Sequence, residues 1–203
     1  CVPTNNKWLE NLISPLSKGF WDYTYGRQLG RDTTKFSEQQ IFKRYFPDKS
    51  MIPQKDFFCK NANAAITRKA WSKYRFNEFL TGLEDMYIAK QIYNDKGCIG
   101  YVSESIVYHI HDETFEQIKI RYERESIALQ EIMPEVHISF LDMINFIMIG
   151  ILKDLKKAIK KGVFKQEFLS IINFRFFQYY GVYRGNHLAQ QLSYQKKIKY
   201  FYP

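Results

Sequence analysis

The chain has 203 residues, which is enough for one sizeable domain or for a domain with an appendage. Hydrophobic residues make up 45% of it and charged residues 25%, so we expect a folded chain with a buried core and exclude a low-complexity one. The net charge of +9 is unevenly distributed, because the chain from Pro134 onward contains nine lysines and two arginines but only four carboxylates. This basic segment indicates an anionic partner, either lipid head groups or nucleic acid.

The three cysteines, at positions 1, 59 and 98, form no CxxC pair. They predict buried or half-buried thiols in a reducing cytosol. Nothing resembles a signal or transit peptide. The first residue is Cys1 rather than Met, which we interpret as an excised segment.

The predicted elements begin with a helix over residues 8–16, where apolar side chains recur at helical spacing. Aromatic alternation over residues 20–25 predicts a short strand that Gly26 ends. A weaker helix follows over residues 36–45, and Pro47 stops it.

The middle of the chain has the pattern of an α/β protein. A strand is expected over residues 57–66, then a short helix over 68–74 and the clearest helix over 83–94, with Gly97 beyond its end. Two strands separated by a turn are expected next, over residues 98–102 and 106–109. Helix, glycine, strand, turn and strand in this order favour an α/β fold.

The last third of the chain is predicted to be helical. A charged helix over residues 116–133 closes at Pro134, and two apolar-aromatic helices follow over 140–160 and 167–180, before a Lys-rich end. The best domain boundary is Pro134, where the charge balance shifts, so we expect domains over 1–133 and 134–203.

Two features in the first part point to chemistry. Glu84 and Asp85 lie in the first turn of the expected helix, where backbone N–H groups keep a carboxylate ionised and able to take a proton from a hydroxyl. His109 ends an expected strand, at the sheet edge where α/β proteins bind ligands. Without further context, the acidic pair is a helix cap and His109 a structural histidine.

An ordered set of short motifs supplies that context. The motifs are Val2-Pro3 with Trp8-Leu9, Tyr25-Gly26-Arg27-Gln28, Tyr45-Phe46-Pro47-Asp48, Phe58-Cys59-Lys60-Asn61-Ala62-Asn63-Ala64-Ala65, Arg68, Phe76-Asn77-Glu78, Gly82-Leu83-Glu84-Asp85, Gly97, Tyr101-Val102 and Val107-Tyr108-His109. Together they resemble the second half of family-2 inverting glycosyltransferases, in particular the rhamnosyltransferase-like group of O-antigen and capsule enzymes. The resemblance spans about residues 2 to 125.

The resemblance implies a partial GT-A (Rossmann-like) domain that lacks its N-terminal nucleotide-binding half and is followed by an amphipathic helical tail. Asp85 would be the catalytic base and Glu84 its partner. His109, or alternatively His111, would join the site of a divalent cation (Mg²⁺ or Mn²⁺). The implied substrate contacts are Arg27, Gln28, Asn61, Asn63 and Gly82, although the asparagines also suit turns and Arg27 and Gln28 a solvated loop. The family's acidic metal motif would stand immediately before Cys1, so this segment alone is expected to be inactive.

The implied partners are a nucleotide-sugar donor and a glycan or lipid-linked glycan acceptor, in the synthesis of cell-surface polysaccharides. Lysines and aromatics on amphipathic helices are typical of an interfacial helix, so we expect a cytoplasmic protein, peripheral on the inner face of the membrane. No nucleic-acid motif occurs, and we expect no nucleic-acid partner. The alternatives are apolar faces that pack on the catalytic domain, or a non-enzymatic module that binds membrane or nucleic acid.

Overall fold

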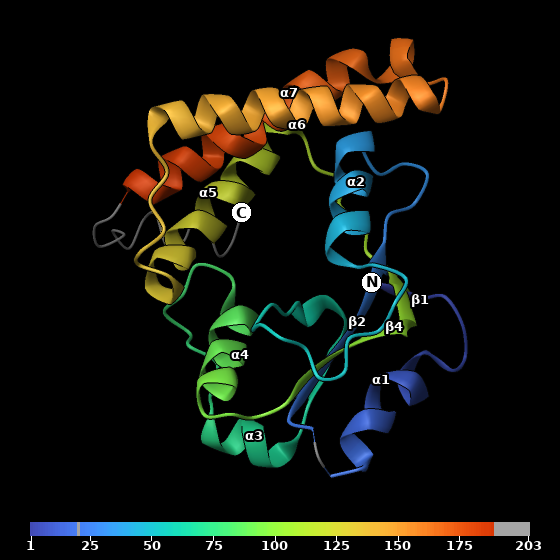
Figure 1. Cartoon of the computed structure of the whole chain (residues 1–203), viewed down its shortest axis with the longest axis vertical. Coiled ribbons are helices and arrows are strands. Elements are labelled where there is room, and N and C mark those ends of the chain that lie inside the picture. The colour runs from blue at the N-terminus through green and yellow to red at the C-terminus, as the bar shows by residue number, and fades with distance from the viewer. Residues whose placement is uncertain (20, 189–203) are drawn as a thin grey trace. The chain divides into compact units, whose positions relative to one another are not determined.

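The computed structural model describes residues 1–19 and 21–188, which form two compact units (Figure 1). The first unit consists of residues 1–34, 38–78 and 84–111, and the second of residues 35–37, 79–83 and the chain from 112 onward. The domain boundary predicted at Pro134 rests on the change in charge along the sequence and not on packing, and it stays a prediction. Phe20 of the first expected strand and the Lys-rich end lie outside the described residues.

The first unit is built on a curled mixed sheet with the strand order β1-β4-β2-β3. The strands are β1 (Val2–Pro3), β2 (Tyr23–Leu29), β3 (Ala64–Ile66) and β4 (Ile99–Tyr108). Strands β2 and β4 run parallel, whereas β1 and β3 pair antiparallel with β4 and β2. The sheet and its helices confirm the mixed α/β class.

Helices cover both faces of this sheet. They are α1 (Trp8–Ser17), α2 (Phe36–Tyr45), α3 (Arg68–Lys73) and α4 (Glu84–Asn94), with a 3₁₀ turn, η1, at Asn61–Asn63. Helix α1 packs on one face, where the Thr24 hydroxyl donates to the Leu12 carbonyl at 2.8 Å. Tyr23 and Tyr25 alternate with Thr24 along β2 and are buried in the core on the other face, as the two-residue period of a strand requires.

That core is aromatic and contains side chains of α2 and α4. Tyr25 packs against Phe58 and Tyr101, and Phe46, directly after α2, reaches both of these rings. Ile88 and Ala89 of α4 are fully buried in the same cluster. The high aromatic content of the chain therefore serves packing in this unit.

Strand β2 differs from its prediction, because it runs through Gly26 and ends at Leu29. A side chain at Gly26 would lie 2.3 Å from Asn63 Nδ2 and 2.4 Å from the Ser105 carbonyl. The glycine is therefore required by a close approach inside the sheet rather than by a turn. Arg27 and Gln28 consequently lie within the strand and not in a solvated loop.

The two strands expected over 98–102 and 106–109 are one strand, β4. The polar residues 103–105, which suggested a turn, are an irregularity in its pairing, because Gly26 pairs with Val102 and the next residue, Arg27, with Ile106. The strand expected over residues 57–66 is also wrong over its first seven residues. Only Ala64–Ile66 pairs, and the preceding residues include the turn η1.

The second unit contains α5 (Phe115–Ile132), α6 (Phe140–Lys160) and α7 (Phe164–His187). Thr114 and Ser139 cap α5 and α6, each in a capping box. Helix α7 is longer than the expected 167–180, and it packs against both α5 and α6. Gly181 and Gly185 allow its close approach to α5, since a Cβ there would lie 2.4 Å and 2.3 Å from the carbonyls of Lys119 and Glu123.

A buried ion pair joins α6 to α7. Asp154 is 2% exposed and accepts from Arg175 Nε at 2.8 Å, while Arg175 also donates to the Gln178 side chain at 2.7 Å. Within the described part of the chain, no helix is both long enough and apolar enough to cross a membrane.

Candidate functional site

Asp85 lies in the first turn of α4 with its carboxylate almost completely covered, at 5% exposure. One oxygen accepts from the backbone N–H of Asn61 at 2.7 Å, and the other from the backbone N–H of Met86 at 2.7 Å. The Asn61 side chain in turn accepts from the Tyr23 hydroxyl at 2.5 Å. The structure thus brings together two of the predicted site residues that are far apart in sequence.

Burial dominates the electrostatics of this cluster. It raises the pKa of Asp85 above the ordinary value of 3.8, although the Lys60 ammonium and the two backbone N–H groups act in the opposite direction. Burial also raises the pKa of the neighbouring Cys59 thiol well above its usual value, and the charge of Asp85 adds to this effect. Asp85 is therefore a stronger proton acceptor than a solvated aspartate.

The other members of the acidic motif are divided between the units. Glu84 is half-buried, and its carboxylate accepts a long hydrogen bond from the Asn61 side chain at 3.4 Å. Leu83 has a left-handed backbone with φ of 55°, which is uncommon for a branched side chain. Gly82 and Leu83 belong to the second unit, where Gly82 lies beside Arg124.

Asn63, in the turn η1, and Gln28, in β2, are both buried. Asn63 accepts from the Trp8 indole at 2.8 Å and donates to the Ser105 carbonyl at 2.8 Å, so its amide is occupied by the fold. Gln28 is 2% exposed, and its Nε2 has no hydrogen-bond partner among the described residues. A substrate contact by either residue stays a prediction.

Arg27 is half-buried on β2 and lowers the pKa of Tyr101, which burial raises overall. Its Nε is covered and makes no hydrogen bond to any described residue. A covered guanidinium nitrogen without an acceptor is costly. Because this nitrogen is covered, a contact between Arg27 and a substrate stays a prediction.

The two candidate metal ligands lie directly after β4 and face each other. His111 Nδ1 lies 2.9 Å from a carboxylate oxygen of the buried Glu38, and His109 Nδ1 lies 2.8 Å from the sulfur of Cys1. The remaining ring nitrogens, both Nε2, approach each other closely. The structure therefore does not choose between His109 and His111 but pairs them.

A cation at this pair stays a prediction. The two Nε2 atoms approach each other more closely than two ligands of one cation would, since nitrogens bound to one ion at about 2.1 Å stand about 3 Å apart, and a hydrogen bond between the rings accounts for the approach. Glu38, at the other nitrogen of His111, is the kind of carboxylate that orients a metal-binding histidine. Imidazole nitrogens suit Zn²⁺ or Cu²⁺, whereas Mg²⁺ and Mn²⁺ prefer oxygen ligands, so the pair favours neither of the two expected cations.

The cluster around Asp85 and the histidine pair border the same aromatic core. The Tyr23 hydroxyl donates to the side chain of Asn61, and Asn63 of the same turn donates to the carbonyl of Arg27. His109 N donates to the carbonyl of Leu29, the last residue of β2. Phe42 of the core contacts both histidine rings edge-on.

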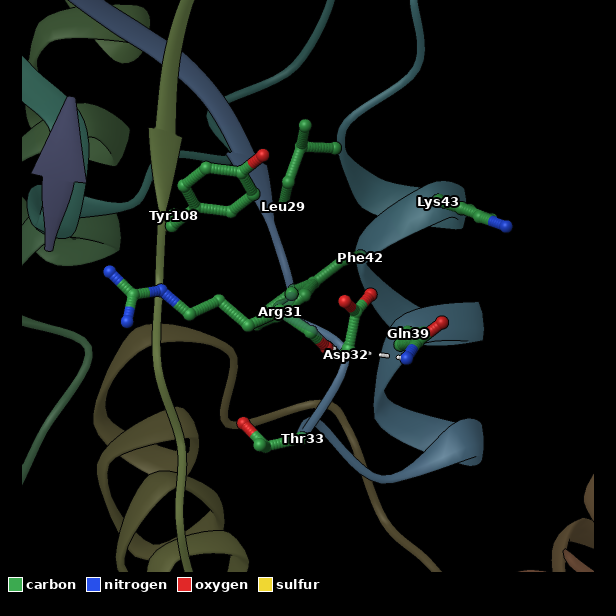
Figure 2. Close-up of a pocket in the computed structure, with 9 residues that line it drawn as sticks. Leu29, Arg31, Asp32, Thr33, Gln39, Phe42, Lys43 and Tyr108 are labelled. Carbon is green, nitrogen blue, oxygen red and sulfur yellow. Dashed lines mark hydrogen bonds between the residues drawn. The ribbon is translucent and has the colours of Figure 1, made fainter. Parts of the chain in front are cut away.

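A cavity of about 610 Å³ opens at the histidine end of β2. Its lining residues are Leu29, Gly30, Arg31, Asp32, Thr33, Gln39, Phe42, Lys43 and Tyr108. Figure 2 shows the loop after β2 on one side of it and α2 on the other, with Gln39 bonded to the Arg31 carbonyl at 3.4 Å. None of the predicted site residues is among those that line it.

Sequence reasoning missed Glu38, Tyr23 and Cys1 as neighbours of the predicted site. Glu38 lies in a helix that the sequence indicated correctly, but no spacing rule connects it with His111, 73 residues later.

The chain matches no protein-family model, no curated protein and no solved structure.

Proposed function

We propose that this chain carries the acceptor-binding and catalytic-base half of an inverting family-2 glycosyltransferase, which moves a sugar from a nucleotide-sugar donor to a glycan or lipid-linked glycan acceptor. The observation that carries this proposal is the hydrogen bond from Asn61 to Asp85. It joins two motifs of the resemblance, and it holds a carboxylate at a helix N-terminus with a raised pKa.

In the proposed reaction, Asp85 takes the proton from an acceptor hydroxyl. The acceptor oxygen forms a bond to the anomeric carbon from the side opposite the leaving group, while the bond from that carbon to the nucleoside diphosphate breaks. The proton ends on Asp85 and the negative charge on the diphosphate. The raised pKa of Asp85 favours the proton transfer, because a general base works best when its pKa lies near the working pH.

The leaving diphosphate needs positive charge, and two groups are proposed to supply it. Arg27 is half-buried on β2 and carries a guanidinium. His109 and His111 are the candidate ligands of a divalent cation, which would neutralise the diphosphate when bound.

The test is sugar transfer by the full-length gene product, measured as nucleoside diphosphate released from a panel of nucleotide sugars with and without lipid-linked glycan. Asp85→Asn should lower kcat by about 10² to 10⁴-fold, the usual contribution of a general base. The matched control is Asp95→Asn, because Asp95 lies just beyond the other end of α4 and pairs with Lys73 at the surface.

Asp95→Asn should keep wild-type turnover. Retention of a tenth of wild-type turnover by Asp85→Asn, with an unchanged melting curve, would reject Asp85 as the base. If no nucleotide sugar in the panel gives acceptor-dependent release, the proposal of glycosyl transfer itself is rejected.

A further inference from the structure

Helix α6 has two apolar rows, and only one of them is packed. Met143, Ile147, Gly150, Asp154 and Ala158 are its buried residues and follow each other at helical spacing. A second row at the same spacing points away from the unit. This outer apolar row consists of Leu141, Ile144, Met148, Leu152 and Ile159, which are 71%, 40%, 51%, 61% and 62% exposed.

The outer apolar row is continuous from Leu141 to Leu152, which is 12 residues of helix, or about 17 Å at 1.5 Å per residue. Ile159 follows two turns later, and Leu155 between them is half-buried and packs on the cluster of Phe36, Ala158 and Ile171. Single exposed apolar side chains are normal on soluble proteins, but a contiguous row marks an interaction surface.

A basic row accompanies the C-terminal half of the same helix. Lys153, Lys156, Lys157 and Lys160 are all exposed. At 3.6 residues per turn they lie between the buried row and the outer apolar row, with Lys156 nearest the outer apolar row and Lys157 nearest the buried one. The helix therefore has one packed, one apolar and one cationic face.

We infer that the outer apolar row and the lysines dock this chain on an anionic lipid surface. An apolar row would lie at the boundary of head groups and acyl chains, and lysines beside it would reach anionic head groups with their long stems. Nucleic acid would use the lysines but leave the apolar row in water. A bilayer uses both rows at once, and a helix that lies in the interface does not need the length of a spanning one.

The test is flotation of the full chain with vesicles of phosphatidylcholine and of a 70:30 mixture of phosphatidylcholine and phosphatidylglycerol. The chain should bind the mixed vesicles more tightly than the neutral ones. Binding should weaken in 0.5 M salt without vanishing, because salt screens only the charges.

Two sets of substitutions separate the contributions. Replacing the four lysines with Gln should weaken binding to the mixed vesicles by about 10² to 10³-fold, since each lysine near an anionic surface contributes about fivefold. Replacing Leu141, Met148 and Leu152 with Ser should weaken binding to both kinds of vesicle by at least about 10²-fold. The matched control replaces three exposed apolar residues elsewhere, Leu9, Ile13 and Phe79, with Ser, and should bind as the wild type does.

Sedimentation of the same variants tests the competing occupants. A wild-type chain that ignores vesicles but is a dimer, and becomes monomeric with the Leu141, Met148 and Leu152 substitutions, would make the row an interface between copies. A monomer that ignores vesicles would show that the row docks neither on lipid nor on a second copy of the chain. Either result overturns the lipid proposal and leaves the proposed glycosyl transfer untouched.

Discussion

The buried ion pair between α6 and α7 offers the most direct test of the second unit. Arg175→Met keeps most of the apolar length of the side chain but removes its charge. Asp154, at 2% exposure, would lose both guanidinium contacts, at 2.8 Å and 2.7 Å. Removing one partner of a buried pair leaves an uncompensated charge, and it costs about 3–5 kcal/mol.

This cost is large for a unit of this size. A loss of 1 kcal/mol lowers the midpoint by about 4–8 °C in a domain of 60–100 residues. Arg175→Met should therefore lower the midpoint of the helical unit by at least about 12 °C in thermal melts followed by circular dichroism at 222 nm. The double variant Asp154→Leu/Arg175→Met should recover most of this loss, because an apolar pair fills the site without a buried charge.

The control is the exposed pair of Lys73 and Asp95, whose side chains are 63% and 49% exposed. Lys73→Met should melt as the wild type does, since water screens this pair. If Arg175→Met also melted within about 2 °C of the wild type, Asp154 and Arg175 would not form a buried pair in solution, and the packing of α6 on α7 would have to be revised.

Three further predictions concern the site and the packing of α7. In full-length protein, the acid limb of the kcat–pH profile should lie above pH 3.8, because burial raises the pKa of Asp85 and only its ionised form accepts a proton; a limb at or below 3.8 would contradict this. Both His109→Ala and His111→Ala should raise the Mn²⁺ concentration for half-maximal activity. Glu38→Gln should raise this concentration about 10- to 100-fold, because Glu38 orients His111. If only one of the two histidine variants raised it, the pair would be rejected as the metal site. Gly185→Ala should cost about 1–3 kcal/mol in urea unfolding, because its Cβ would lie 2.3 Å from the Glu123 carbonyl; wild-type stability would show that α5 and α7 are further apart.

Helices were predictable from the sequence because their signals are local. The apolar spacing over residues 8–16, 36–45 and 140–160 agrees with the observed helices within one residue or two. Strands were less predictable, because their boundaries depend on partners. Gly26 has the local signature of a turn, and only the approach of Asn63 and Ser105 explains why it lies inside a strand.

The candidate site was predictable in part for the same reason. The position of Asp85 in the first turn of α4 is a local property, and the sequence indicated it correctly. The contacts of Asp85 with Asn61, and of His111 with Glu38, join residues 24 and 73 positions apart. No periodicity encodes such contacts, since they arise when strands and helices pack around one core.

The burial of Asp85 has an energetic consequence that bears on its role. A carboxyl with a folded-state pKa above its unfolded value of 3.8 stabilises the fold in its protonated form, so this contribution to stability is present at low pH and is lost as the pH rises through the raised pKa. Ionisation of Asp85 in the fold therefore costs stability. The two backbone N–H groups that it accepts from offset part of this cost, but a neutral side chain would avoid it. A residue that only capped α4 and anchored Asn61 could be serine or asparagine, both good acceptors at a helix start. A carboxyl at this position, although its ionisation costs stability, supports the proposal of a general base.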